Sequence, residues 1–317
     1  DEIVAFGHRQ SQTVVATVLV AIAAAYSIYA FNVRLLQANH KVYLALLTFP
    51  KPDIAAQRQL FTAAIEEAVT GRFEARQQLA TFALGLVRNQ SVDQDEVRKL
   101  VEFALAELRE NVDEEPLNIR NHLYFASVAN RAGVLLPDTP RQAMAVLDRP
   151  EVIALSPTRP QIYTELAQAS LLTGDIKRGL ELYQKSLALA PHVLELHVDL
   201  TVAYVVARQG DAAVAQLGTV RRELKQTFSA DHYLRVARTA DRSEQYGVAV
   251  RFFLELLRDW PPKADYYAQL AVAYAKGGDL AKAQAAAEQA LTLDPNIRAD
   301  YDAFLKLLEE RSKQPRG

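Results

Sequence analysis

The chain contains no cysteine, a single methionine (Met144) and no excess of positive charge. Without cysteine it has no disulfide framework, no cysteine-ligated zinc site and no thiol nucleophile. Lysine and arginine number 36 against 38 aspartate and glutamate, so the charges nearly cancel. A protein dedicated to nucleic acid needs a basic excess to meet the phosphates, and we therefore expect no nucleic-acid partner. The 317 residues suffice for two ordinary domains or for one long repeat array.

A long segment without any charged residue lies near the N-terminus. It lies between Arg9 and Arg34, and residues 13–33 form its apolar centre. About 20 helical residues cross the hydrocarbon layer of a membrane. Residues 13–33 are therefore predicted to be a transmembrane helix, with residues 1–12 as its flank. A cleavable signal peptide that ends near residues 23–25 and a buried core helix are the alternatives.

The basic residues around this segment indicate its orientation. Arg9 precedes it in the company of two acidic residues, Asp1 and Glu2, whereas Arg34 and Lys41 follow it without a nearby acid. Because positive charge collects on the cytoplasmic side of a membrane helix, the rest of the chain is expected in the cytoplasm. The chain also begins with aspartate instead of methionine, and we expect it to be the C-terminal part of a longer protein.

A pattern of glycine, aspartate and proline recurs in the second half of the chain. Gly174-Asp175 precedes Pro191 at the same offset at which Gly278-Asp279 precedes Pro295, and Gly210-Asp211 marks a unit between them. No segment after residue 34 shows the sustained apolar–polar alternation of a strand, so the pattern predicts pairs of helices. Units begin near residues 160, 194, 230 and 264, so that each starts about 34–36 residues after the one before it.

These units resemble the tetratricopeptide repeat family, whose period is about 34 residues with a helix–turn–helix in each unit. The resemblance implies an all-α solenoid whose first helices line a groove for a protein or peptide. Residues 160–297 are predicted to hold four units, after a degenerate unit at 118–158 and before a capping helix and polar tail at 298–317. Irregular helical pairs at 34–117 are expected to link the membrane helix to the repeats.

Three phrases in the N-terminal part carry a second resemblance. They are Phe31-Asn32-Val33-Arg34, Gly71-Arg72-Phe73-Glu74-Ala75-Arg76-Gln77-Gln78-Leu79 and Asn118-Ile119-Arg120-Asn121. Through them, residues 13–135 are similar to the C-terminal portion of O-antigen ligase-related membrane proteins of bacteria, some of which carry tetratricopeptide tails. The resemblance implies the bacterial inner membrane and a glycosyl-transferring enzyme whose catalytic loops lie upstream of this chain. No catalytic residue of that family is therefore transferred onto this sequence.

No residue pattern in the chain indicates catalysis, a cofactor or a metal site. None of the six histidines stands three or four residues from another, the spacing that a metal site on one helix requires. Gly277-Gly278 is the turn of a repeat and not a phosphate-binding loop. Glu66-Glu67 is expected on a solvent-facing helix, and Asp113-Glu114-Glu115 in a loop before Pro116, so neither suggests an acid–base pair held in a pocket. We expect no enzymatic activity within these residues.

A stripe of arginines marks the candidate binding site. Arg235, Arg238 and Arg242 stand at i, i+3 and i+7 on the first helix of the third unit, and Thr164 and Gln168 hold the matching groove positions in the first unit. Guanidinium groups recognise carboxylates through paired hydrogen bonds, so an acidic protein or peptide is the expected partner. A solvated face, partly neutralised by neighbouring acids, is the alternative. The lysine–asparagine set with which chaperone-binding members of the family clamp a C-terminal carboxylate is not present.

Together these patterns predict a membrane-anchored tetratricopeptide scaffold that binds other proteins at a bacterial inner membrane. Two alternatives stay open at this point. In the first alternative, the chain is the tail of an O-antigen ligase-like enzyme. In the second, it is a secreted periplasmic repeat protein whose apolar segment is a cleaved signal peptide.

Overall fold

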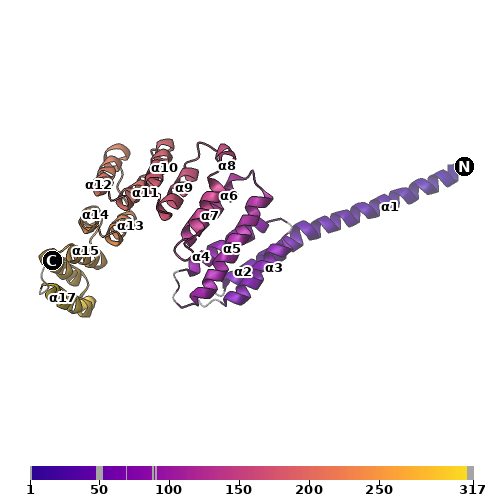
Figure 1. The fold of residues 1–317 in the computed structure, drawn as a ribbon. Coiled ribbons are helices and arrows are strands. Elements are labelled where there is room, and N and C mark those ends of the chain that lie inside the picture. The colour runs from indigo at the N-terminus through magenta and orange to yellow at the C-terminus, as the bar shows by residue number, and fades with distance from the viewer. Residues whose placement is uncertain (1, 48–52, 69, 88, 90, 313–317) are drawn as a thin grey trace. The chain divides into compact units, whose positions relative to one another are not determined.

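The computed structural model describes residues 2–47, 53–68, 70–87, 89 and 91–312, and within these ranges every regular element is a helix (Figure 1). The chain divides into two compact units, residues 1–155 and residues 156–317. The predicted all-α class is confirmed.

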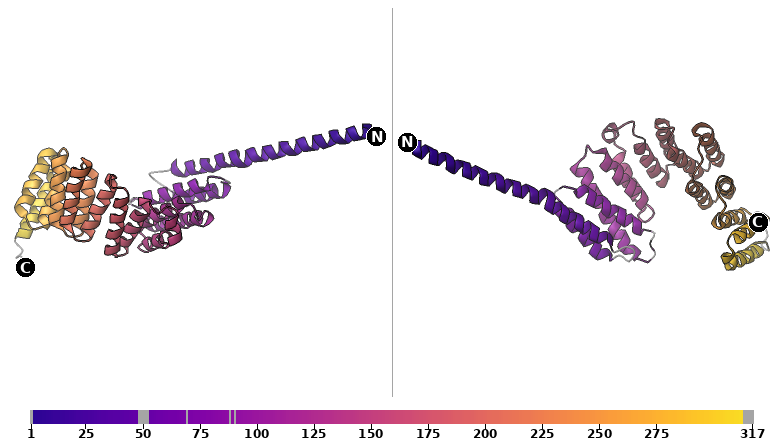
Figure 2. Two further views of the ribbon diagram at one scale, coloured as in Figure 1. Left: turned by 90° about the horizontal axis from the view of Figure 1, so that it is seen from above. Right: turned by 180° about the vertical axis from the view of Figure 1, so that it is seen from behind.

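The N-terminal helix is longer than the predicted span. α1 (Glu2–Ile28), the π-helical turn η1 (Tyr29–Val33) and α2 (Arg34–Leu47) follow one another without a break, as Figure 2 shows. The helix does not end at residue 33 because neither glycine nor proline interrupts it between there and Leu47. From Val14 to Leu47 the helix is long and apolar enough to cross a membrane. Within its most apolar stretch of 18 residues, only 6% is buried. A core helix would be mostly buried, so that alternative is wrong for this chain, whereas a membrane span and a signal sequence both fit.

Residues 34–155 form three packed helix pairs. The pairs are α2 with α3 (Ile54–Glu67), α4 (Arg72–Leu86) with α5 (Gln94–Glu114), and α6 (Ile119–Ala132) with α7 (Thr139–Leu147), and the short α8 (Pro150–Ala154) follows. α3 shows why such segments are helical. At its start Asp53 accepts a hydrogen bond from the backbone N–H of Ala56 (3.0 Å), and along its length Phe61, Ala64 and Ile65 bury one face.

α5 extends further than the sequence indicates. The sequence predicts a loop at residues 113–115, but α5 continues to Glu114, so that prediction is wrong for Asp113 and Glu114. Its last turn is held by Arg76 of α4, whose guanidinium donates to Asn111 (2.8 Å) and pairs with Glu114 (3.2 Å). A contact between residues far apart in sequence therefore lengthens this helix.

Residues 156–312 form four helix pairs and a terminal helix. The pairs are α9 (Pro160–Leu172) with α10 (Ile176–Leu189), α11 (Leu194–Val206) with α12 (Gly210–Thr219), α13 (Ala230–Arg242) with α14 (Tyr246–Asp259), and α15 (Ala264–Lys276) with α16 (Leu280–Leu293). The π-helical turn η2 (Val220–Leu224) prolongs α12. After the 3₁₀ turn η3 (Pro295–Ile297), α17 (Arg298–Ser312) packs against α16.

The four pairs turn at equivalent positions. The turn residue has a positive φ at Gly174 (90°), Arg208 (57°), Glu244 (58°) and Gly278 (86°), and these positions recur at the same intervals as the starts of the predicted units. The sequence pattern suggested Gly210-Asp211 as the turn of the second pair, and this alignment is wrong by two positions. Arg208 and Glu244 adopt the left-handed conformation although they are not glycine, at a steric cost of about 1–2 kcal/mol for each residue. Their turns thereby stay at the positions equivalent to Gly174 and Gly278.

Small residues at a second set of equivalent positions let each pair pack closely. Gly179, Ala213, Ala249 and Ala283 are all buried and recur at the same intervals as the turn residues. A Cβ atom at Gly179 would collide with the side chain of Leu171 on the facing helix. Larger side chains here would push the two helices apart, which is the physical reason that these positions hold glycine or alanine.

A polar side chain near the start of a first helix contacts the carbonyl of a proline in the segment that leads into that helix. The Tyr163 hydroxyl donates to the Pro157 carbonyl (2.6 Å), and one repeat later the His197 ring contacts the Pro191 carbonyl (2.7 Å). The His122 ring on α6 makes the same contact with the Pro116 carbonyl (2.9 Å). The predicted degenerate unit at 118–158 stays a prediction, and its first helix begins with this shared contact.

Candidate partner-binding surface

Arg235, the first arginine of the predicted stripe, pairs with two acidic side chains of the same chain. Its guanidinium donates to Asp199 Oδ1 (2.6 Å) and to Glu195 Oε1 (2.9 Å), both on α11. The Asp199 side chain is only 10% exposed, and this burial raises the pKa of its carboxyl while Arg235 opposes the rise. Arg235 therefore ties α13 to α11.

Arg238 and Arg242 are exposed and have no carboxylate partner among the described residues. Arg238 Nε donates to the amide oxygen of Gln269 on α15 (2.9 Å), and Arg242 Nε donates to the Arg238 carbonyl (3.3 Å). Asp241, one of the acids expected to neutralise the stripe, instead pairs with Lys276 (2.8 Å). The two guanidinium groups keep their charge available on the surface of α13.

Arg238 also borders a small pocket between α13, α14 and α15. The pocket has a volume of about 220 Å³, and its lining includes Phe253, Ala268 and Val272 together with the polar side chains of Arg238, Asp241 and Gln269. Phe253 is buried, and Val272 is 40% exposed. The surface therefore combines an apolar hollow with a cation on its rim, an arrangement that suits a side chain next to a carboxylate.

Thr164 and Gln168 lie on α9 and are not brought into contact with the arginines. The Thr164 hydroxyl bonds to the Ser186 hydroxyl of α10 (2.8 Å), so it helps to join its own helix pair. Gln168 is partly buried on the same helix. Their assignment to a binding groove stays a prediction, as does that of the arginines.

Sequence reasoning missed a polar cluster centred on Asp259, at the end of α14. Its carboxylate accepts hydrogen bonds from Tyr233 (2.5 Å), Thr227 (2.5 Å) and Arg221 (2.6 Å). Burial acts to raise the pKa of Asp259, but these hydrogen bonds outweigh it and hold that pKa well below its usual range. The contributing residues are 26–38 positions away in sequence, so no local signal announces the cluster. Through Tyr233 and Asp259, the cluster joins α13, the helix that carries the arginines, to the end of α14.

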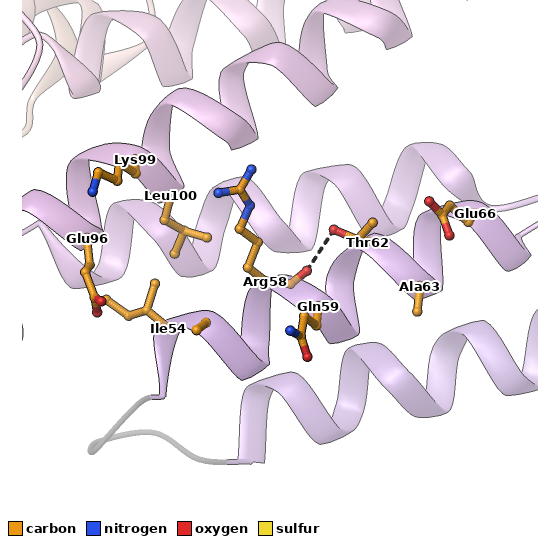
Figure 3. Close-up of a pocket in the computed structure, with 10 residues that line it drawn as sticks. Ile54, Arg58, Gln59, Thr62, Ala63, Glu66, Glu96, Lys99 and Leu100 are labelled. Carbon is orange, nitrogen blue, oxygen red and sulfur yellow. Dashed lines mark hydrogen bonds between the residues drawn. The ribbon is translucent and has the colours of Figure 1, made fainter.

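A second pocket opens in the N-terminal unit, between α3 and α5 (Figure 3). It has a volume of about 510 Å³ and an apolar part that includes Ile54 and Leu100. Charged side chains of both signs surround it: Arg58, Glu66, Glu96 and Lys99. Arg58 also lies over the ring of Phe103, 4.5 Å from its centroid. Because the charges balance, the pocket favours no ligand of one sign. In the part of the chain that the structure describes, no cluster of His, Asp and Glu is placed to hold a metal ion.

Comparison with known proteins supports the repeat architecture. The tetratricopeptide repeat family model matches residues 264–297, which contain α15 and α16. A solved tetratricopeptide repeat protein from Parabacteroides merdae aligns over 86% of this chain and 99% of its own, with 12% identity and a TM-score of 0.51. No curated protein matches.

Two further solved structures align less closely. PilF of Pseudomonas aeruginosa covers 75% of this chain and 99% of its own, with 15% identity and a TM-score of 0.42. YrrB, a tetratricopeptide repeat protein with an unusual peptide-binding site, covers 63% and 97%, with 15% identity and a TM-score of 0.39. The resemblance of residues 13–135 to O-antigen ligase-related proteins stays a prediction. Residues 264–297 thus match a tetratricopeptide repeat, and they are part of an all-helical chain whose fold is similar to that of a solved tetratricopeptide repeat protein.

Proposed function

We propose that this protein is a non-catalytic scaffold, anchored in a bacterial inner membrane, whose repeats capture an acidic segment of another protein in the cytoplasm. The observation that carries the proposal is the pair Arg238 and Arg242, two exposed guanidinium groups without a carboxylate partner among the described residues. A solenoid of helix pairs presents a continuous surface that suits an extended peptide.

The chemistry of the surface defines the expected ligand. A carboxylate of the partner pairs with Arg238 or Arg242, and an adjacent apolar side chain enters the pocket of about 220 Å³ beside Phe253 and Val272. In this proposal Arg235 does not bind the partner, because its guanidinium already pairs with Asp199 and Glu195. Binding of this kind weakens as salt is added, since exposed charges are screened within about 8 Å at physiological ionic strength.

The apolar helix supports the membrane part of the proposal. Its side chains from Val14 to Phe31 are largely exposed, and large apolar side chains on a soluble surface would be unfavourable. Arg34 and Lys41 follow the span whereas only Arg9 precedes it, which favours repeats on the cytoplasmic side. Resistance of the membrane-bound chain to extraction at alkaline pH tests the anchor. Release into the soluble fraction would contradict it.

Peptide binding is tested with an array of dodecapeptides, followed by fluorescence anisotropy with the strongest binder. We expect selected peptides to contain aspartate or glutamate beside an apolar residue, and to lose affinity when the carboxylates are replaced by amides. Exposed ion pairs contribute about 0.2–1 kcal/mol each, so Arg238→Glu, which turns attraction into repulsion, should cost about 1–2 kcal/mol, or roughly 5–30-fold in Kd.

Arg222→Glu is the matched control. Arg222 is equally an exposed arginine of the C-terminal unit, but it lies on η2, outside the first helices of the repeats. The control should bind the peptide as the unmodified chain does, although its net charge equals that of Arg238→Glu. Equal loss in both variants, or selection of peptides without acidic residues, would refute the assignment.

A further inference from the structure

α2 carries a stripe of exposed apolar side chains that no described part of the chain covers. Leu36 (71% exposed), Tyr43 (57%) and Leu47 (54%) lie on one face together with the exposed His40. The opposite face is occupied, because Ala38 and Ala45 are buried there and Lys41 pairs with Glu67 of α3. α2 is therefore a helix with one face committed to its own unit and one face exposed.

The exposed face has the spacing of a coiled-coil seam. Its residues 36, 40, 43 and 47 follow one another at intervals of four, three and four, which is the alternation of the a and d positions of a heptad. The flanking e and g positions hold Gln37, Asn39, Leu44 and Leu46, none of which is charged. Charged residues at these flanks decide which helix is accepted as a partner. Without them, nothing at the flanks repels an identical helix.

The continuity of α2 with the apolar helix points to the same partner. Residues 14–33 are enough to cross a hydrocarbon layer of about 30 Å, so the 14 residues of α2 extend about 21 Å beyond it. Lipid tails cannot cover a stripe at that height when the helix continues straight. Two copies anchored in one membrane with the same orientation, however, present their α2 helices in parallel and at the same level.

We propose that α2 forms a parallel pair with α2 of a second copy of this chain through Leu36, His40, Tyr43 and Leu47. The proposal rests on the membrane anchor proposed above, since α2 alone is too short for a stable isolated coiled coil. Confinement to one bilayer raises the effective concentration of the two helices, and a short seam then suffices. The polar His40 within the seam fixes the register, as single polar residues do at such positions.

The absence of cysteine makes a direct test available. Leu36→Cys and Tyr43→Cys place a thiol on the seam, and Gln37→Cys, an exposed neighbour on the flank, is the matched control. A disulfide requires Cα atoms about 4.4–6.8 Å apart, which facing seam residues provide. After mild oxidation of membranes that contain the full chain, both seam variants should give several-fold more reducible dimer on non-reducing gels than Gln37→Cys. Equal cross-linking in all three variants, or none in any, would overturn the proposal.

Two further measurements separate the possible reasons for failure. Alkaline extraction of the same membranes reports whether the chain is anchored, so an anchored chain without seam-specific cross-linking rejects the pairing and leaves the scaffold proposal in place. A fluorophore attached to the Tyr43→Cys variant should resist quenching by lipids brominated in their acyl chains. Strong quenching would assign the stripe to the bilayer and reject the second copy as its partner.

Discussion

Arg235 and Arg238 should respond differently to replacement, although they are three positions apart on one helix. Arg235→Ala removes two hydrogen bonds from a charged donor and leaves Asp199 buried without its cation. The bond to the half-exposed Glu195 contributes little, whereas a hydrogen bond to a buried charged group contributes about 1.5–3 kcal/mol. We expect a loss of about 2–3 kcal/mol in the free energy of unfolding. Arg238→Ala should change it by no more than about 0.5 kcal/mol, because that side chain is on the surface.

Trp260 offers a local probe for this measurement. It is the only tryptophan, and its indole N–H donates to the Phe228 carbonyl (2.9 Å) in the segment that leads into α13. Urea unfolding followed by its fluorescence therefore reports on the part of the solenoid that holds both arginines. Equal free energies for Arg235→Ala and Arg238→Ala would refute the role of Arg235 in joining α13 to α11.

The pH dependence provides an independent check on the same assignment. Burial raises the pKa of Asp199, and removal of Arg235 should raise it further. A carboxyl whose pKa is raised in the folded state stabilises the fold below its unfolded pKa, near pH 4, and this stabilisation is lost as pH rises through the folded pKa. Between pH 4 and pH 7, the difference in unfolding free energy between Arg235→Ala and the unmodified chain should therefore grow once pH exceeds the folded pKa that Asp199 has in the unmodified chain. A difference that is constant over this range would argue against an ionised, buried Asp199.

Three other substitutions test the architecture by urea unfolding followed by circular dichroism. Arg76→Met should lower the free energy of unfolding by about 3 kcal/mol, because Glu107 and Asn111 lose the guanidinium that they bind. An unchanged free energy of unfolding would contradict the role of Arg76 in holding the end of α5. Glu244→Gly should stabilise the chain by about 0.5–1 kcal/mol through relief of its positive φ, whereas destabilisation would show that the side chain is needed at the turn. Tyr163→Phe should lower the free energy of unfolding by about 1 kcal/mol, since the Pro157 carbonyl loses its donor, and an unchanged urea midpoint would contradict a stabilising role for this hydrogen bond.

The sequence by itself determined the elements and their spacing. An uninterrupted apolar run near the N-terminus and a regular recurrence of small residues and turns in the C-terminal half are local patterns, and both correspond to helices in the structure. The sequence also showed that the interval between the starts of the second and third units is longer than the others. It placed the turn of the second unit at Gly210-Asp211, however, two positions after the turn residue Arg208. Glycine is the usual residue for a positive φ, so a turn built on Arg208 has no recognisable local signal.

Only the tertiary structure decided how the side chains on these helices are used. Helical spacing places Arg235, Arg238 and Arg242 on one stripe, but Arg235 meets a carboxylate 36 residues away and the other two meet none among the described residues. The end of α5 depends in the same way on Arg76, and the exposed face of α2 is defined by the packing of Ala38 and Ala45 against its own unit. Helix periodicity is a property of neighbouring residues, whereas ion pairing and burial depend on which distant segments the fold brings together. For this reason the sequence predicted a solenoid, and the structure was needed to separate Arg235, which pairs with carboxylates of α11, from Arg238 and Arg242, which have no carboxylate partner among the described residues.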